Sequence, residues 1–124
     1  MPALGRQPST IIDHGQVAEL IQAIGIEDFL DIVKTLEHEV DLQIVALEER
    51  SRACQADDVK KTAHRLAGLL SQFGALGVAA CAERVRQAPT NDEVNRLAAS
   101  MVSLCRASMA AIAHLPLEPA GKGL

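Results

Sequence analysis

Histidine is the side chain that most often carries proton and group-transfer chemistry near neutral pH, and this chain has four of them. His14 falls in a predicted helix-cap region and His114 at a predicted helix C-terminus, where an imidazole faces the helix dipole without further purpose. His38 stands between two glutamates beside an apolar stripe, which predicts a solvated position. His64 therefore remains as the candidate nucleophile.

Apolar residues around His64 repeat at helical spacing and predict where its ring points. At about 100° per residue, Val59, Leu66 and Leu70 fall on one side of a helix, and His64 falls nearly opposite. We therefore expect the imidazole to face solvent. Its expected neighbours on that exposed face are Lys60, Lys61, Ala67, Gly68 and Ser71.

Gly68 lies one turn after His64. A glycine inside a helix costs about 1 kcal/mol relative to alanine, and an exposed position offers no packing in return. The missing side chain would let another surface approach the imidazole. The alternative interpretation is a tight helix crossing, but Gly68 falls on the side of His64, away from the apolar stripe.

The segment around His64 is basic, although the chain as a whole is acidic. The chain has 12 Lys and Arg against 16 Asp and Glu, a net charge of -4. Residues 59–86 contain five basic residues against Glu83 alone, a local charge of +4, which leaves -8 for the remainder. Such a patch suits an anionic partner, and an ordinary solvated face is the alternative. The five basic residues are Lys60, Lys61, Arg65, Arg84 and Arg86.

Several function classes are disfavoured by composition and spacing. The negative charge and the aromatic content of 2% argue against a nucleic-acid binder. Cys54, Cys81 and Cys105 form no CxxC pair, so we expect neither a zinc site nor a disulfide framework but small core residues of a reduced cytoplasmic protein. No histidine has a glutamate three positions before it, and no phosphate loop or nucleophile–base pair is present, so neither a metal centre nor an autonomous enzyme is expected.

Length and composition predict one all-helical domain. The 124 residues are 48% hydrophobic with almost no aromatics, which favours packed helices over a sheet. No proline occurs between residues 9 and 88. We expect an antiparallel four-helix bundle over residues 13–115, with a short additional N-terminal helix and flexible tails at 1–12 and 116–124. No signal peptide is apparent, and the uncharged segment 66–82 is too short to span a membrane, so no direct membrane contact is expected.

The expected helices are bounded by caps and glycines. A first helix is expected from Asp13 to Gly25, a long second helix after Gly25, and a third from near Asp57 to Gly74. The fourth closes at Pro89, and the fifth follows Thr90. The stripe expected to bury the second helix is Phe29, Val33, Leu36, Val40, Ile44 and Leu47. The heptad stripe expected to bury the fifth is Val94, Leu97, Met101, Leu104, Ser108, Ala111 and Leu115.

At these residues the sequence resembles the histidine-containing phosphotransfer (HPt) domain of bacterial two-component phosphorelays. Residues 63–68, Ala-His-Arg-Leu-Ala-Gly, and 73–75, Phe-Gly-Ala, are similar to the family's Ala-His-x-Leu-Lys-Gly and Leu-Gly-Ala. The apolar positions Val78, Cys81 and Val85 are similar to its Leu-rich helix. Ala67 departs from the pattern, because the family usually has a lysine there that is thought to help neutralise the phosphoryl group.

The resemblance implies a phosphoryl carrier in signal transduction. His64 would accept phosphate from a receiver-domain aspartate and pass it to the aspartate of another response-regulator receiver, normally through the ring nitrogen farther from the backbone. Mg²⁺ is expected on the receiver, with no cofactor on this chain. The chain would be free-standing or the C-terminal module of a hybrid sensor histidine kinase. The residues expected to dock the partner are Lys60, Lys61, Arg65, Ala67, Gly68, Ser71, Gln72 and Arg86. A helical adaptor without phosphotransfer is the alternative.

Overall fold

The computed structural model describes residues 11–115, and this part of the chain is all-helical, as expected. Its helices are α1 (His14–Ile24), α2 (Ile26–Arg52), α3 (Ala56–Ser71), α4 (Val78–Gln87) and α5 (Asn91–Ala113). The only extended pairing among the described residues is an isolated antiparallel bridge between Ile12 and Ala75. The tail expected at 116–124 lies outside the described residues.

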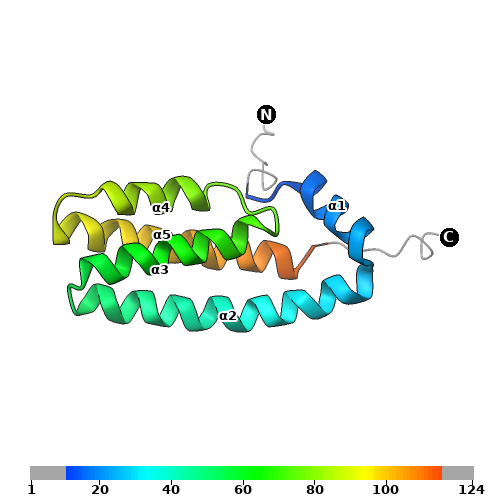
Figure 1. The fold of residues 1–124 in the computed structure, drawn as a ribbon, viewed down its shortest axis with the longest axis horizontal. Helices are drawn as coiled ribbons and strands as arrows, with labels where there is room; N and C mark the ends of the chain where they lie inside the picture. The colour runs from blue at the N-terminus through cyan, green and yellow to red at the C-terminus, as the bar shows by residue number, and fades with distance from the viewer. Residues whose placement is uncertain (1–10, 116–124) are drawn as a thin grey trace, which may run out of the picture.

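The helices pack together into an elongated bundle (Figure 1). Figure 1 shows α2, α3, α4 and α5 side by side along the long axis of the molecule, with α1 across one end beside the start of α2. α5 packs against α2, α3 and α4, and α3 packs against α2, α4 and α5. α3 and α4, which contain His64 and every predicted partner-docking residue except Gln72, are therefore neighbours.

The apolar stripe predicted for α2 is confirmed, because all six of its residues are buried. Leu, Val, Ile and Ala fill most of the core around it. The two phenylalanines, Phe29 of α2 and Phe73 after α3, meet within this core with ring centroids 6.2 Å apart and an interplanar angle of 50°. This tilted arrangement is favourable for an aromatic pair and joins the beginning of α2 to the end of α3.

The heptad stripe predicted for α5 is correct for Val94, Leu97, Met101 and Ser108, which are buried, and wrong for the other three positions. Leu104, Ala111 and Leu115 are only partly buried, whereas Cys105, Met109 and Ile112 lie in the core. A straight α-helix drifts by about 20° per heptad relative to a strict seven-residue repeat. The buried face of α5 therefore rotates along the helix.

Among the described helices, α5 is long and apolar enough to span a membrane by length and composition alone. In this structure it packs against three other helices. The core helix of a bundle meets the same criteria by burying its apolar face inside the protein. The uncharged segment singled out in the sequence, residues 66–82, instead forms the end of α3, a turn and the start of α4.

The segment just before α1 belongs to the folded unit, so the prediction of a tail extending to residue 12 is wrong at its end. Ile12 is only 2% exposed. The Leu76 amide donates to the Ile11 carbonyl at 2.7 Å, and the Asp13 amide donates to the Gly74 carbonyl at 2.7 Å. The apolar pair Ile11 and Ile12 thus packs beside the turn that joins α3 to α4.

The predicted helix caps are present, but each forms only half of a capping box. The Asp13 carboxylate accepts from the Gln16 amide at 3.1 Å, and the Thr90 hydroxyl accepts from the Glu93 amide at 3.1 Å. The Gln16 side chain donates to the Ser71 carbonyl at 2.9 Å instead of returning to Asp13. α1 is thereby tied to the end of α3.

Two of the three cysteines lie in the core, whereas the third does not. Cys81 and Cys105 are buried, and Cys54 is exposed in the turn after α2 with a φ of 56°. The prediction that all three are core residues is therefore wrong for Cys54. Cys54 lies in the short connection between α2 and α3, outside the faces that these helices bury.

We predict that replacing Gly74 with alanine destabilises the protein by about 1–3 kcal/mol. Gly74 has a φ of +86°, and an added Cβ would lie 3.0 Å from the Asp13 carbonyl oxygen and 3.0 Å from Val17 Cγ2. The free energy of unfolding in urea measures this change. An unchanged unfolding midpoint would contradict the close contact between the pre-α1 segment and this turn.

Thiol reactivity checks the burial of the cysteines. Burial raises the pKa of Cys105 to about 12 and also raises the pKa of Cys81, so both thiols stay protonated and covered at neutral pH. We expect an alkylating reagent to modify Cys54 alone in the folded protein and all three cysteines after denaturation, as counted by mass spectrometry. Rapid modification of a second thiol under native conditions would contradict this core.

Candidate functional site

His64 lines an open groove of about 810 Å³ between α3 and α4. Its side chain is exposed, as the helical pattern predicts. The opposite side of α3 is held in the core by Val59, Leu66 and Leu70, each of which is 0% exposed. The rotation of α3 is therefore set by its apolar face, and the imidazole points outward into the groove.

The only buried polar side chain of α3, Thr62, has its hydrogen bonds satisfied. Its hydroxyl donates to the Asp58 carbonyl at 2.8 Å and accepts from Arg50 Nη1 of α2 at 2.8 Å. This bond joins α3 to α2 two residues before His64. It adds a directional contact to the apolar packing that orients the helix.

The groove brings together most of the residues predicted to dock a partner. Two predictions about them need correction. Ala67 is 5% exposed and therefore buried, although it still lines the groove. Gln72 is the C-cap residue of α3 and does not line it. α3 packs against three helices, which leaves it a narrower exposed arc than a helix with one buried face. The predicted residues that share the groove with His64 are Lys60, Lys61, Arg65, Gly68, Ser71 and Arg86.

α4 supplies groove residues that the sequence analysis missed. Ala79, Ala82 and Glu83 line the groove together with Arg86. These positions are spaced i, i+3, i+4 and i+7 and so occupy one face of a helix. That spacing is the signal in the sequence that indicates these residues share a face. The short side chains of Ala79 and Ala82 leave the groove open along the α4 side.

Gly68 is not required by the fold. A Cβ added at this position would meet no atom of another part of the protein within 4 Å. The φ angle of Gly68 is not positive, so the backbone does not require glycine there. The alternative of a tight helix crossing is therefore excluded. The bare backbone one turn after His64 faces open space, which is the clearance that an approaching surface would need.

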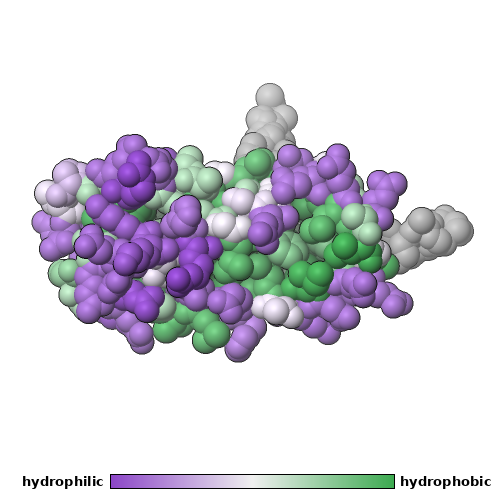
Figure 2. Space-filling view, in the orientation of Figure 1, coloured by the Kyte–Doolittle hydropathy of each residue, from purple (hydrophilic) through white to green (hydrophobic). Residues whose placement is uncertain are grey.

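The surface over this region is hydrophilic toward one end. Figure 2 shows hydrophilic side chains gathered over the first half of α3 and the last half of α4, with more apolar surface toward the end where α1 lies. Lys61 and Arg65 of α3 are exposed and form no ion pair within residues 11–115. Their charges are therefore directed to solvent or to a partner.

Lys60 differs from these two residues because it is engaged by α4. Its ammonium donates to the Ala88 carbonyl at 3.2 Å, just past the last turn of that helix. A cation at a helix C-terminus is favoured by the helix dipole and satisfies a carbonyl that lacks a helical partner. Lys60 thus joins the two walls of the groove at one end.

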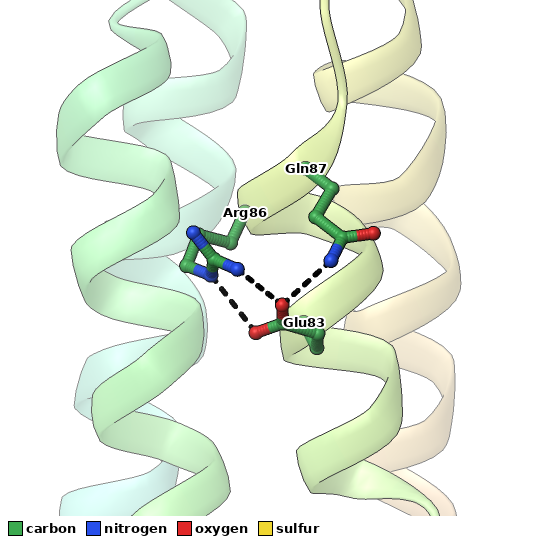
Figure 3. A network of polar contacts seen from close by, with 3 residues as sticks. All are labelled: Glu83, Arg86 and Gln87. Atoms are coloured by element: carbon green, nitrogen blue, oxygen red, sulfur yellow. Dashed lines mark hydrogen bonds and ion pairs between the residues drawn. The ribbon is translucent and has the colours of Figure 1, made fainter.

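Arg86 is also engaged, in a network confined to α4 (Figure 3). Arg86 Nε donates to Glu83 Oε1 at 2.8 Å and Arg86 Nη2 donates to Glu83 Oε2, while Gln87 donates to Glu83 Oε2 at 2.8 Å. The hydrogen bonds and the charge of Arg86 lower the pKa of Glu83 below its usual value. The carboxylate therefore stays ionised at neutral pH and keeps Arg86 bonded to it.

The described residues contain no group of three or more His, Cys, Asp or Glu side chains placed to hold a metal ion. The potential metal ligands that line the groove are His64 and Glu83. What the arrangement offers chemically is one accessible imidazole, unpaired cations beside it and an approach path over Gly68.

Comparison of the chain with protein-family models, with curated proteins and with solved structures found no match. The function is therefore inferred from the residues of the groove.

We predict that Gly68→Ala raises the free energy of unfolding by about 1 kcal/mol, because alanine favours the helix and its Cβ meets nothing. Urea denaturation measures this change, and Gly74→Ala provides the contrasting case. A loss of stability in the Gly68 variant would show that the glycine has a structural role in α3.

Proposed function

We propose that the protein is a phosphoryl carrier of the HPt type, built as an antiparallel four-helix bundle. His64 accepts a phosphoryl group from the aspartyl phosphate of one receiver domain and passes it to the aspartate of another. The observation that carries this proposal is the exposed imidazole in a groove with unpaired cations on one side and a bare glycine backbone one turn away.

The transfer step requires a neutral imidazole. The lone pair of Nε2 attacks phosphorus, an N–P bond forms, and the P–O bond to the receiver carboxylate breaks with its electron pair leaving on that carboxylate. The proton on Nδ1 passes to solvent. The return step to a second receiver is the reverse, with a carboxylate as the nucleophile. Mg²⁺ is expected on the receiver, where it would offset the charge of the transferring group.

The groove residues support this step through access and charge. Lys61 and Arg65 flank His64 in the sequence and in the groove, so they would attract the acidic pocket of a receiver and orient it over the ring. Gly68 leaves room for the backbone of the partner. No described side chain hydrogen-bonds to His64, so we propose a carrier and not an autonomous enzyme.

The proposed partners are response-regulator receiver domains in the cytoplasm, and a hybrid sensor histidine kinase is the proposed parent or donor. One observation favours a second function, a helical adaptor that binds through the same groove without phosphate. Ala67 stands where the resembled family usually has a lysine, and it is buried. An adaptor would retain the groove without that cation.

We predict that His64→Gln abolishes the uptake of acid-labile phosphate from receiver domains phosphorylated with acetyl phosphate. The substitution is at an exposed position, so the helical circular dichroism spectrum should not change. Labelling with radioactive phosphate, followed by acid treatment, measures the uptake.

His38→Gln is the matched control, because His38 is an exposed histidine on α2 outside the groove. This variant should be labelled like the unmodified protein. Labelling that persists in His64→Gln would identify another acceptor. Receiver binding without labelling of the unmodified protein would favour the adaptor.

A further inference from the structure

The pair formed by Glu83 and Arg86 lies in the same groove as His64, which distinguishes it from ordinary surface ion pairs. Arg86 is bonded to the carboxylate through two of its nitrogens, so its guanidinium is occupied by an acceptor from its own helix. In Figure 3 its side chain lies on the side of α4 that faces α3. The cation that α4 contributes to the groove is therefore bonded to Glu83 and not free.

This pair can be broken at low cost. The side chains of Arg86 and Glu83 are 63% and 48% exposed. Exposed ion pairs contribute little to stability because water screens the charges and replaces the hydrogen bonds. Arg86 can consequently leave Glu83 when a stronger acceptor comes within its reach.

A phosphoryl group on His64 would be such an acceptor. It carries nearly two negative charges and three acceptor oxygens, whereas the Glu83 carboxylate carries one charge and two oxygens. The planar guanidinium matches phosphate in the same bidentate manner as it matches carboxylate. Ala67 supplies no cation, so the positive charges that line the groove are those of Lys60, Lys61 and Arg65 on α3 and of Arg86 on α4.

We infer that Glu83 binds Arg86 while His64 is unphosphorylated, and that Arg86 moves from the Glu83 carboxylate to the phosphoryl oxygens once His64 is phosphorylated. This inference rests on the proposed function. Glu83 is then a positioning residue, because it acts on the phosphoryl group through Arg86. The exchange stabilises phosphohistidine without a lysine at position 67.

The test is the equilibrium constant for transfer between a phosphorylated receiver and His64, measured for four proteins: the unmodified chain, Glu83→Gln, Arg86→Gln and the double variant. This constant compares free species, so weaker docking alone does not change it. We expect Glu83→Gln to shift it toward phosphohistidine and Arg86→Gln to shift it away, each by about two- to five-fold, as for an exposed ion pair.

Competition between the two acceptors has a specific signature in the double variant. Arg86→Gln should shift the transfer equilibrium further away from phosphohistidine when residue 83 is already glutamine. In that background Arg86 has no carboxylate to leave and interacts fully with the phosphoryl group. Equal effects of Arg86→Gln in both backgrounds, or no effect in either, would overturn the exchange.

α5 supplies a matched control. Glu93 and Arg96 form an ion pair of the same residue types and the same i,i+3 spacing, with side-chain exposures of 39% and 65%. Neither lines the groove. Glu93→Gln and Arg96→Gln should leave the transfer equilibrium unchanged, and a shift of equal size there would also overturn the inference.

Failure of the proposed function would give a different result. In that case the unmodified chain would bind a receiver but take up no phosphate. If the further inference alone fails, all four proteins are labelled and their transfer equilibria are identical.

Discussion

The burial of one side of α3 is the constraint on which the groove depends. Val59, Leu66 and Leu70 are excluded from water by α2, α4 and α5, and they leave the helix only a narrow arc of solvent-facing positions. His64 and Gly68 fall on that arc. The direction of the imidazole is thus a result of hydrophobic packing on the far side of its own helix, and the ring needs no local hydrogen bond to hold it outward.

Charge in the groove is organised more finely than a count of residues suggests. Five basic residues between positions 59 and 86 indicate a uniformly positive patch. In the folded protein, Lys60 is bonded to the end of α4 and Arg86 to Glu83, whereas Lys61 and Arg65 have no such partner within residues 11–115. Arg84 does not line the groove, and the four cations that do divide into two that are bonded to α4 or its side chains and two that face outward from α3.

Much of this architecture could be predicted from the sequence, because it depends on local patterns. The stripe of α2, the glycine between α1 and α2 and the caps at Asp13 and Thr90 all follow from spacing within one segment. Two of the features that were missed depend on neighbours far away in the chain. Ala67 is buried because α3 has three partners, and Ile12 is buried because it meets the turn after α3. Sequence periodicity does not report how many helices surround a given one.

The short pairing of Ile11 and Asp13 with Leu76 and Gly74 has a mechanical consequence. These bonds fasten the entry of the chain to the connection between the two walls that enclose the imidazole. A pulling force applied ahead of Ile11 would be delivered to that connection before it reached α1 or α2. The position of this connection thus depends on residues that lie outside both walls.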